Sequence, residues 1–403
     1  MSVQRVGVVG MGGAGLAFVA ALRRHAGFDW VALAEPVDAV RQRCTVEFGV
    51  PAYASLAGLL AHPGLDAVII ATPTELHTGQ TVEAAEAGKH VLVEKPMAVS
   101  MQAGRSMVDA ADKAGVTLLV GHSHSHDLPI RRMRDLIESG ELGAVGMVNS
   151  WCYSDWIERP RRPAELDATL GGGVTFRQGS HQFDIVRLLC GGLARGIRAR
   201  AFDWNPRRSG IGAHSAWIDF DNGAAATAIY NGYGGFSTMD LCDDISEWGL
   251  RQPAASRAGR GALAQARSQQ DELREKRERA GTAIPAQAPY QPHFGLTLVS
   301  CERGDIRQSP DGLKVDSRTG AREILLPTDR SPRELVLDEF HGAITGALRP
   351  LHDGRWGLAT LELCVAALES SRTGVEVRLR EQISVCSIPV APGPFTPGTI
   401  PTR

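Results

Sequence analysis

The chain has 403 residues, of which 43% are hydrophobic and 22% are charged. Most single domains are shorter, so we expect two domains, each with enough apolar residues to bury a core. The 43 basic and 45 acidic side chains nearly cancel, which gives no general attraction to nucleic acid or to an anionic membrane surface. No apolar run approaches the roughly 20 residues that span a bilayer, so no membrane segment is predicted.

The N-terminus and the cysteines indicate the compartment. The first residues, MSVQRVGVVGMGGAG, lack the layout of a signal peptide and run directly into a strand and a glycine pattern. The seven cysteines are widely scattered and form no C-x-x-C pair. This arrangement favours reduced thiols and therefore a cytoplasmic protein.

The first part of the chain alternates short apolar, β-rich runs with amphipathic stretches. Strands are expected at 5–9, 30–34, 67–71, 90–93 and 117–120, and helices at 13–24, 37–48, 76–87 and 103–114. Such alternation implies a mainly parallel sheet that is covered on both faces. We therefore predict an α/β domain with a doubly wound parallel sheet over residues 1–123.

The pattern changes after Gly121. Strands are expected at 145–153, 196–202, 215–220 and 224–232, and helices at 129–139, 182–189 and 358–370. Longer strands with glycine-rich connections are typical of an α+β domain with an open, mostly antiparallel sheet, which we place at 124–403. An open sheet face is costly to leave in water, so a homodimer or homotetramer is expected.

Residues 251–288 have a composition of their own, rich in Ala, Arg, Gln and Glu with almost no large apolar side chain. The composition favours a solvated helix with frayed ends. A mobile arm or lid is the alternative.

The segment VGVVGMGGAG places Gly10, Gly12 and Gly15 in G-x-G-x-x-G spacing, after a predicted strand and at the start of a predicted helix. In that context the first glycine permits a tight turn, the second lets the backbone approach a pyrophosphate, and the third lets helix and strand pack closely. The diphosphate then lies on the helix N-terminus. Met11 and Gly13 complete this predicted cofactor-binding turn.

Glu35 follows twenty residues after Gly15, at the end of the second predicted strand. A carboxylate there accepts hydrogen bonds from the adenosine ribose hydroxyls and repels a 2′-phosphate, which favours NAD over NADP. Arg41 and Arg43 lie nearby, so NADP stays open as an alternative.

Four further motifs carry a family resemblance: ATPTELH at 71–77, EKP at 94–96, a GGG…H…D block at 171–184 and the closing helix. In this order and spacing the chain resembles the glucose–fructose oxidoreductase/inositol dehydrogenase/rhizopine catabolism (Gfo/Idh/MocA) family over nearly its whole length. The resemblance implies an NAD-binding Rossmann domain followed by an α+β domain with an open sheet, often used for oligomerisation.

The resemblance also implies roles for individual residues. Lys95 would be the principal catalytic residue, and the bond to Pro96 is expected to be cis. Thr72, Pro73, His77 and Glu94 would line the cofactor. General chemistry agrees, because a lysine that is partly buried beside a cationic nicotinamide ring has a lowered pKa and becomes a usable base.

The block GGGVTFRQGSHQFD retains the family's His181 and Asp184, but Arg177 stands where many members have an aspartate. His181 is expected to orient a substrate hydroxyl or to share the proton, and Asp184 to lie at the substrate. A guanidinium at 177 suits bidentate binding of a substrate carboxylate. Pairing of Arg177 with an internal acid is the alternative.

Aromatic residues and histidines near this block are further candidates. Tyr153 and Trp156 are expected to stack on an unsaturated substrate ring, or else to form a partly buried hairpin. His122, His124 and His126 alternate, which places them on one face if the strand before them continues. Because hydride transfer to NAD needs no metal, we predict no metal site and assign His124 to the substrate, with a histidine metal site as the alternative.

Within the family, the chain is most similar to the aromatic cis-dihydrodiol dehydrogenases, notably those for phthalate 4,5-cis-dihydrodiol. This implies oxidation of a carboxylated cyclohexadiene cis-diol to the catechol, with reduction of NAD. A sugar or inositol dehydrogenase is the first alternative, although a neutral polyol gives Arg177 nothing to pair with. A non-catalytic NAD-binding sensor is the second, although it would not need both Lys95 and His181.

Overall fold

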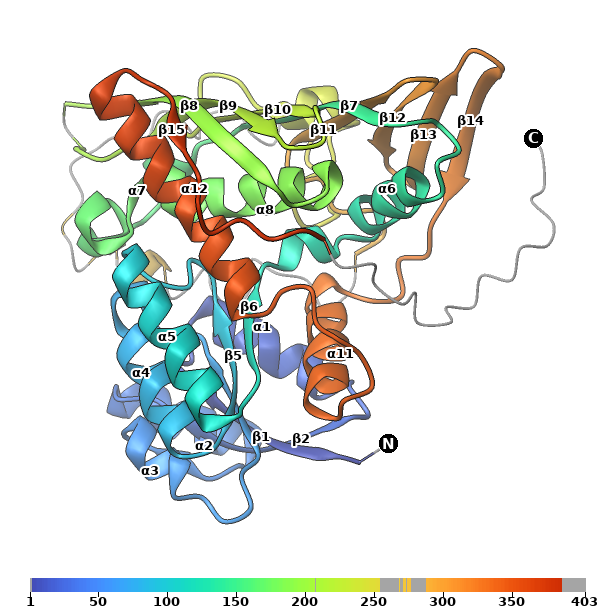
Figure 1. The fold of residues 1–403 in the computed structure, drawn as a ribbon. Coiled ribbons are helices and arrows are strands. Elements are labelled where there is room, and N and C mark those ends of the chain that lie inside the picture. Colours follow the sequence, from blue (N-terminus) through green and yellow to red (C-terminus); the bar gives the residue numbers. More distant parts are fainter. Residues whose placement is uncertain are drawn as a thin grey trace.

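The computed structural model describes residues 2–206, 208–253, 268, 271–272, 274–276 and 288–385. These ranges form two sheets, the parallel one in the lower half of Figure 1 and the larger one across the top. None of the helices within them is both long and apolar enough to cross a membrane. Most of 251–288 lies outside the described residues, so both interpretations of that segment stay open.

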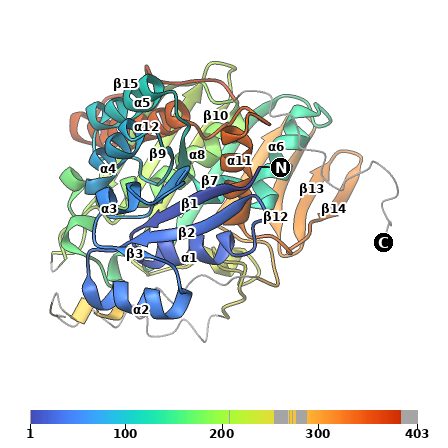
Figure 2. The same ribbon diagram turned by 90° about the horizontal axis from the view of Figure 1, so that it is seen from below.

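The first sheet has six parallel strands in the order β3-β2-β1-β4-β5-β6. Its strands are β1 (Gln4–Val9), β2 (Phe28–Ala34), β3 (Ala52–Tyr53), β4 (Ala67–Ile70), β5 (His90–Glu94) and β6 (Leu118–Gly121). The helices are α1 (Gly13–Leu22), α2 (Asp38–Phe48), α3 (Leu56–Leu60), α4 (Thr74–Glu86) and α5 (Met101–Ala114). α1 and α2 cover one face and α3, α4 and α5 the other (Figure 2). The predicted doubly wound parallel sheet is confirmed, and its strand order is that of dinucleotide-binding folds.

These strands were predictable because both faces of the sheet are covered. All four residues of β4 are buried, so the strand is an uninterrupted apolar run. The helix boundaries follow from local hydrogen bonds. α5 begins at Met101, two residues before its predicted start, because the Ser100 side chain caps it by accepting from the backbone N–H of Ala103.

The second sheet has nine strands in the order β14-β13-β12-β11-β7-β10-β9-β8-β15. They are β7 (Val145–Tyr153), β8 (Ala194–Phe202), β9 (Ala213–Phe220), β10 (Ala225–Asn231), β11 (Leu296–Cys301), β12 (Gly304–Ser309), β13 (Gly312–Ser317), β14 (Gly320–Leu325) and β15 (Val377–Arg378). β7 and β10 pair in parallel, and all other neighbours are antiparallel. The expected open, mostly antiparallel sheet is therefore confirmed.

Helices cover one face of this sheet. Those that contact it are α6 (Leu128–Glu138), α7 (Gly173–Arg177), α8 (Gly179–Cys190) and α12 (Gly354–Thr373). α8 lies against β7 and β10, and α12 lies against β8. The opposite face leaves Met147, Trp151 and Trp217 exposed by 41%, 39% and 44%. That apolar face fits the expected homodimer or homotetramer, which stays a prediction.

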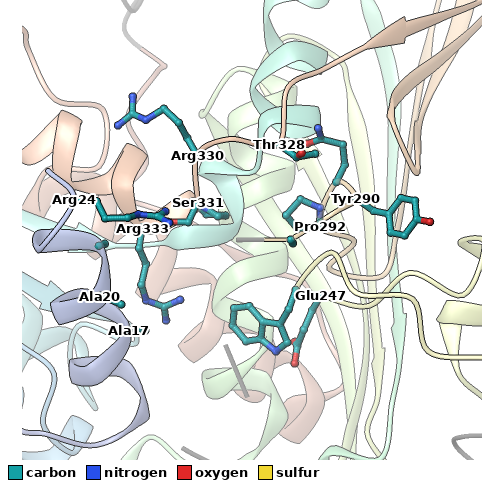
Figure 3. Close-up of a pocket in the computed structure, with 15 residues that line it drawn as sticks. Ala17, Ala20, Arg24, Glu247, Tyr290, Pro292, Thr328, Arg330, Ser331 and Arg333 are labelled. Carbon is teal, nitrogen blue, oxygen red and sulfur yellow. The ribbon is translucent and has the colours of Figure 1, made fainter. Parts of the chain in front are cut away.

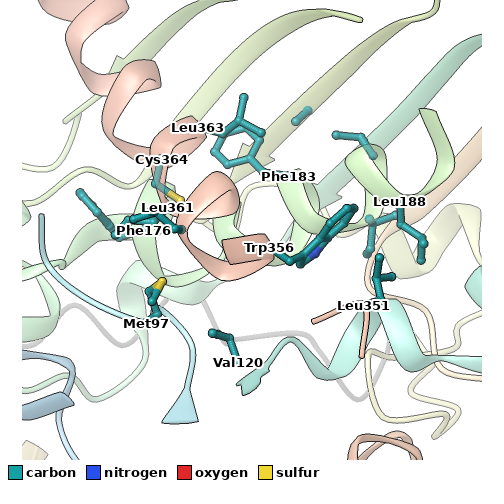
Figure 4. Packing of buried hydrophobic residues seen from close by; sticks show 14 of the residues in the cluster. Met97, Val120, Phe176, Phe183, Leu188, Leu351, Trp356, Leu361, Leu363 and Cys364 are labelled. Atoms are coloured by element: carbon teal, nitrogen blue, oxygen red, sulfur yellow. The ribbon is translucent and has the colours of Figure 1, made fainter. Parts of the chain in front are cut away.

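A shared apolar core fixes the two sheets relative to each other. Met97 and Val120 from the first part pack with Trp356 and Leu361 of α12 and with Phe183 of α8 (Figure 4). α12 contacts α5 and β6 on one side and α8 and β8 on the other. The seam between the sheets is consequently held by buried side chains.

α11 (Pro332–Ile344) was not predicted. Although it comes late in the chain, it packs on α1, and Val336, Leu337 and Phe340 share a fully buried core with Phe18. Ser331 and Glu334 form a capping box at its start. The S-P-R-E sequence at 331–334 is typical of a helix start and is the local signal for α11.

His352, just before α12, belongs to a buried charged network. Its Nδ1 lies 2.8 Å from Oε2 of Glu339 on α11, and the same oxygen lies 2.8 Å from Nε2 of His126 in the 3₁₀ helix η1 (Ser123–His126). Burial opposes protonation of His352, but Glu339 and Asp184 outweigh it and raise its pKa to about 9. An ion pair therefore joins η1, α11 and the start of α12.

We expect this ion pair to make the fold more stable at pH 6.5 than at pH 9.5. Because the pKa of His352 is raised on folding, its contribution is complete below the pKa of the unfolded chain and is lost as the pH rises through about 9. The contribution is at most about 3 kcal/mol. Urea unfolding at both pH values should show that His352→Gln removes this part of the pH dependence. An unchanged difference between the two pH values in the variant would contradict the assignment.

Candidate active site

The glycine turn between β1 and α1 has the geometry that dinucleotide binding requires. Gly10 has φ of +88°, and a Cβ there would lie 2.9 Å from the Ala71 carbonyl oxygen. A Cβ on Gly15 would lie 2.0 Å from the carbonyl oxygen of Gly10, so helix and strand touch at this point. A Cβ on Gly12 would meet nothing within 4 Å. The turn thus leaves open space over the N-terminus of α1, where a pyrophosphate fits.

Glu35 closes this turn from the end of β2. It is 8% exposed, and its two carboxylate oxygens accept from the backbone N–H groups of Met11 and Val37, each at 3.0 Å. The carboxylate is therefore held beside the turn, as a ribose-binding acid should be. Arg41, considered for an NADP phosphate, pairs with Asp38 and donates to the Glu35 carbonyl oxygen at 2.8 Å.

His77 connects the ends of β4 and β5. Its Nε2 lies 3.0 Å from the Thr72 carbonyl oxygen, and its Nδ1 lies 2.9 Å from that of Pro96. Burial lowers the pKa of His77. Pro73 follows Thr72 at the start of α4, and the bond between Lys95 and Pro96 is cis, as expected. Strand ends on this edge are where such folds bind ligands.

Lys95 follows directly after β5 and points toward the second half of the chain. Its Nζ donates to the carbonyl oxygen of Arg177 at 2.8 Å. Burial lowers the pKa of Lys95 to about 8; Glu94 opposes this effect and Arg177 adds to it. About a tenth of Lys95 is therefore a neutral amine at pH 7, far more than for an ordinary lysine, and this form has a lone pair for a substrate proton.

His181 and His124 form an aromatic cluster with Phe294. The ring centres of the two histidines are 4.5 Å apart, and those of His124 and Phe294 are 4.4 Å apart. Burial, with further help from the charge of Lys95, lowers the pKa of His181 well below its usual value. Its Nδ1 has no hydrogen-bond partner among the described residues. His181 is thus a neutral imidazole with a free nitrogen near the lysine.

The strand before the three histidines does not continue through them, contrary to the expectation. β6 ends at Gly121, and His124 lies in η1, so the alternating histidines do not share one strand face. His124 Nδ1 lies 3.0 Å from Oδ2 of Asp127, which is fully buried. Burial lowers the pKa of His124 to about 3.

The histidines also do not gather as the alternative metal site requires. Among the described residues, the group with three ligand atoms within 4.8 Å of one another is His126, Glu339 and His352. Hydrogen bonds from both histidines already meet at Glu339 Oε2. His122 and His124 are not part of this group.

Arg177 is committed to an internal acid. Its Nη1 donates to Thr74 Oγ1 at 2.6 Å, and its Nη2 donates to Glu165 Oε1 at 3.3 Å. Burial alone would raise the pKa of Glu165, but Arg177 and Lys276 hold it well below its usual range. The alternative interpretation, pairing of Arg177 with an internal acid, therefore describes this structure. Its role at a substrate carboxylate stays a prediction.

Three other predicted substrate residues make contacts of their own within the described chain. Trp156 is 2% exposed, and the Arg161 guanidinium lies 4.0 Å from its ring centre. Asp184 is fully buried and accepts from Trp356 Nε1 at 2.5 Å, as part of the His352 network. Tyr153 is half-buried and packs edge-on against Phe236. The structure explains the first two as interior packing and polar pairing.

The site also includes residues that were not predicted. The ring of Trp248 lies 5.6 Å from His124, and the guanidinium of Arg333 lies 5.8 Å from the Trp248 ring. Both line a cavity of about 70 Å³ between α1 and α11 (Figure 3). Neither residue belongs to a motif, so nothing in the sequence distinguishes them from other tryptophans and arginines.

The glycine turn, Glu35 and the buried lysine define a Rossmann-fold, NAD-dependent oxidoreductase. Two family models agree: "Oxidoreductase family, NAD-binding Rossmann fold" matches residues 4–122, and "GFO/IDH/MocA C-terminal domain" matches residues 130–234. The chain belongs to the Gfo/Idh/MocA family of oxidoreductases, and the expected cofactor, NAD, is confirmed.

Individual relatives cover most of the chain. It is 35% identical over 384 residues to 1-carboxy-3-chloro-3,4-dihydroxycyclohexa-1,5-diene dehydrogenase of Comamonas testosteroni, covering 91% of this chain and 95% of that protein. A solved structure described as a dehydrogenase, from Bordetella bronchiseptica RB50, has 37% identity and a TM-score of 0.88, covering 94% of this chain and 100% of that one. The WlbA dehydrogenase of Bordetella pertussis, solved with NADH and UDP-GlcNAcA, shares the fold at 22% identity and a TM-score of 0.70, with 94% and 99% covered.

The glycine turn can be tested with a matched pair of variants. Gly12→Val should weaken NAD binding more than about tenfold while the thermal midpoint stays near wild type, because the side chain enters only the cofactor's space. Gly15→Val should lower the thermal midpoint as well, because its Cβ collides with the Gly10 carbonyl oxygen. Calorimetric titration with NAD and thermal unfolding measure both effects. Wild-type NAD affinity in Gly12→Val would disprove the placement of the pyrophosphate.

Proposed function

We propose that this protein oxidises a carboxylated cyclohexadiene cis-diol to the corresponding catechol, with NAD as the hydride acceptor. The observation that carries the proposal is the buried amine of Lys95, with a pKa of about 8, close to the neutral imidazole of His181. The Comamonas testosteroni relative supports the substrate class, because its printed name describes a dihydroxycyclohexadiene that bears a carboxyl group.

The residues present fit an NAD-dependent oxidation. The bound cofactor supplies a nicotinamide carbon that takes the hydride from the carbinol carbon. As the C–H bond breaks, Lys95 accepts the hydroxyl proton and the carbon becomes a ketone carbon. One N–H of the amine meanwhile stays on the Arg177 carbonyl oxygen, which fixes the direction of its lone pair.

His181 is proposed to hold the second hydroxyl of the diol. Its unpaired Nδ1 accepts a hydrogen bond from that hydroxyl, which places the two oxygens relative to Lys95. Transfer of the proton from the neighbouring ring carbon to the ketone oxygen then tautomerises the hydroxyketone to the catechol. Because the product is aromatic, this step draws the oxidation forward.

The walls of the site suit a flat, unsaturated ring. Phe294 and Trp248 both pack on His124, with ring centres 4.4 and 5.6 Å from that of His124. Such side chains offer apolar faces to a cyclohexadiene and few hydrogen-bond partners to a polyol. They therefore favour a ring diol over a sugar or an inositol.

Lys95 should control both the rate and its pH dependence. Because only the neutral amine accepts a proton, kcat/KM should rise about tenfold per pH unit below pH 8 and level off above it. Lys95→Met should lower kcat by about 10²–10⁴-fold and leave the NAD affinity similar. Lys113→Met, an exposed change on α5, is the control and should be neutral. Near-normal turnover in Lys95→Met would refute the assigned role.

A substrate comparison tests the diol itself. The protein is mixed with NAD and with phthalate cis-4,5-dihydrodiol, inositol or glucose, and NADH absorbance is followed. We expect turnover with the dihydrodiol. Turnover with the polyols alone would eliminate the proposal in favour of a sugar or inositol dehydrogenase. Tight NAD binding without turnover of any compound would favour a sensor.

A further inference from the structure

The arginines nearest to the predicted substrate region are all engaged by the protein itself. Arg177 is bound by Glu165 and Thr74, and Arg162 pairs with Glu75 at 3.0 Å. Arg159 pairs with Asp155 at 2.7 Å, and Arg161 stacks on Trp156. A substrate carboxylate would share each of these guanidinium groups with an internal partner. A cation with fewer internal partners would bind the carboxylate of the proposed substrate better.

Arg333, in the first turn of α11, is incompletely paired. It is 9% exposed and makes no hydrogen bond within the described part of the chain, where its buried Nε has no partner. Its nearest acid is Glu94, with Oε1 at 3.6 Å from Nη2, and that oxygen also lacks a hydrogen-bond donor there. A buried guanidinium without hydrogen bonds is costly, so a ligand that supplies oxygen atoms would be favoured.

The cavity beside α11 shows where such a ligand would lie. Arg333 points from the start of α11 toward Ala17 and Glu247 (Figure 3). Its guanidinium lies 5.5 Å from the ring of Phe18 and 5.8 Å from that of Trp248. Trp248 in turn packs on His124, so the cavity and the histidine cluster share one aromatic side chain.

The other cations of the cavity wall have strong partners. Arg24 is bound by Glu334, with its Nε at 3.2 Å from Oε1, and Arg330 pairs with Asp338 at 2.6 Å. Both are also more exposed than Arg333. Among the described residues that line this cavity, Arg333 is thus the cation with free donors and little access to water.

The charge of Arg333 also reaches the reacting groups. It contributes to the lowered pKa of Lys95, of His124 and of His181, in each case after the larger effect of burial. The printed contacts agree, because Arg333 lies 3.6 Å from the carboxylate of Glu94, the residue before Lys95, and 5.8 Å from the Trp248 ring that packs on His124.

We propose that Arg333 is the carboxylate-binding residue of the substrate site, with Trp248 covering the substrate ring next to it. This rests on the proposed function. Two parallel N–H groups of a guanidinium match the two oxygens of a carboxylate, and the surrounding rings exclude water that would weaken the pair. Arg333 then selects carboxylated ring diols over uncharged ones.

A substrate pair isolates this role. Phthalate cis-4,5-dihydrodiol carries carboxylates, whereas benzene cis-dihydrodiol is its uncharged counterpart. Arg333→Gln should raise KM for the carboxylated diol about 10–100-fold and change KM for the uncharged one less than about threefold. At a pH well above the pKa of Lys95, where the amine is neutral with or without Arg333, kcat should change little for either substrate. Arg333→Lys should recover part of the loss, because it restores the charge without the planar fork.

Two controls exclude general effects. Arg330 lies in the same cavity wall but is already paired with Asp338. Arg330→Gln should therefore leave the ratio of KM for the carboxylated diol to KM for the uncharged diol as in wild type. The NAD affinity of Arg333→Gln should also match wild type. Equal losses on both diols, or a weakened NAD affinity with unchanged discrimination, would overturn the proposal and place Arg333 at the cofactor or in the fold.

Failure of the proposed function can be distinguished from failure of the carboxylate site at Arg333. If the wild type oxidises neither diol, phthalate itself serves as the probe in a calorimetric titration of the NADH complex. Binding that Arg333→Gln weakens at least about tenfold, and Arg330→Gln does not, supports a carboxylate site at Arg333 independently of turnover. Phthalate binding that is absent from the wild type or unaffected in Arg333→Gln would disprove the site.

Discussion

The ammonium group of Lys95 is half-buried and loses part of its hydration, and the described chain offers it one hydrogen bond, from its Nζ to the Arg177 carbonyl oxygen. This desolvation depends on both halves of the molecule. β5 delivers the lysine to the edge of the parallel sheet where dinucleotide folds bind ligands, and α7 supplies the carbonyl from the other side. The core around α12 holds the two sides together, so the amine is poised as a base by the same packing that joins the sheets.

The parts of this arrangement that the sequence predicts are local. A parallel strand buried on both faces is an apolar run, and a glycine turn needs specific spacing, so β1, β4 and the cofactor turn were predictable. Lys95 could be singled out because it follows such a run and precedes a proline. α11 was not predicted, because its apolar face packs on Phe18, far away in the chain, and its capping box is its main local signal.

The partners of charged side chains could not be predicted either, because they also depend on contacts that local sequence patterns do not reveal. Arg177 was identified as a departure from the family pattern, but its partner Glu165 reaches it only through the turns η3 (Pro163–Glu165) and η4 (Ala168–Leu170). The same departure removes a carboxylate that could have paired with His181, and within the described part of the chain His181 Nδ1 has no hydrogen-bond partner. Similarly, Asp184 is in its expected place in the motif but is turned into the His352 network.

The charge of a bound substrate changes the pKa of Lys95 and therefore affects which substrates can be oxidised. A carboxylate brought near Lys95 favours its ammonium form and would raise its pKa, which opposes its use as a base. The cationic nicotinamide ring acts in the opposite direction. If the substrate carboxylate is paired with Arg333, the positive guanidinium largely cancels the effect of the carboxylate on the Lys95 amine. The pKa of Lys95 then stays near its value without substrate. A guanidinium at this position would therefore do more than bind an anionic diol, because it would keep the base neutral while the anion is bound.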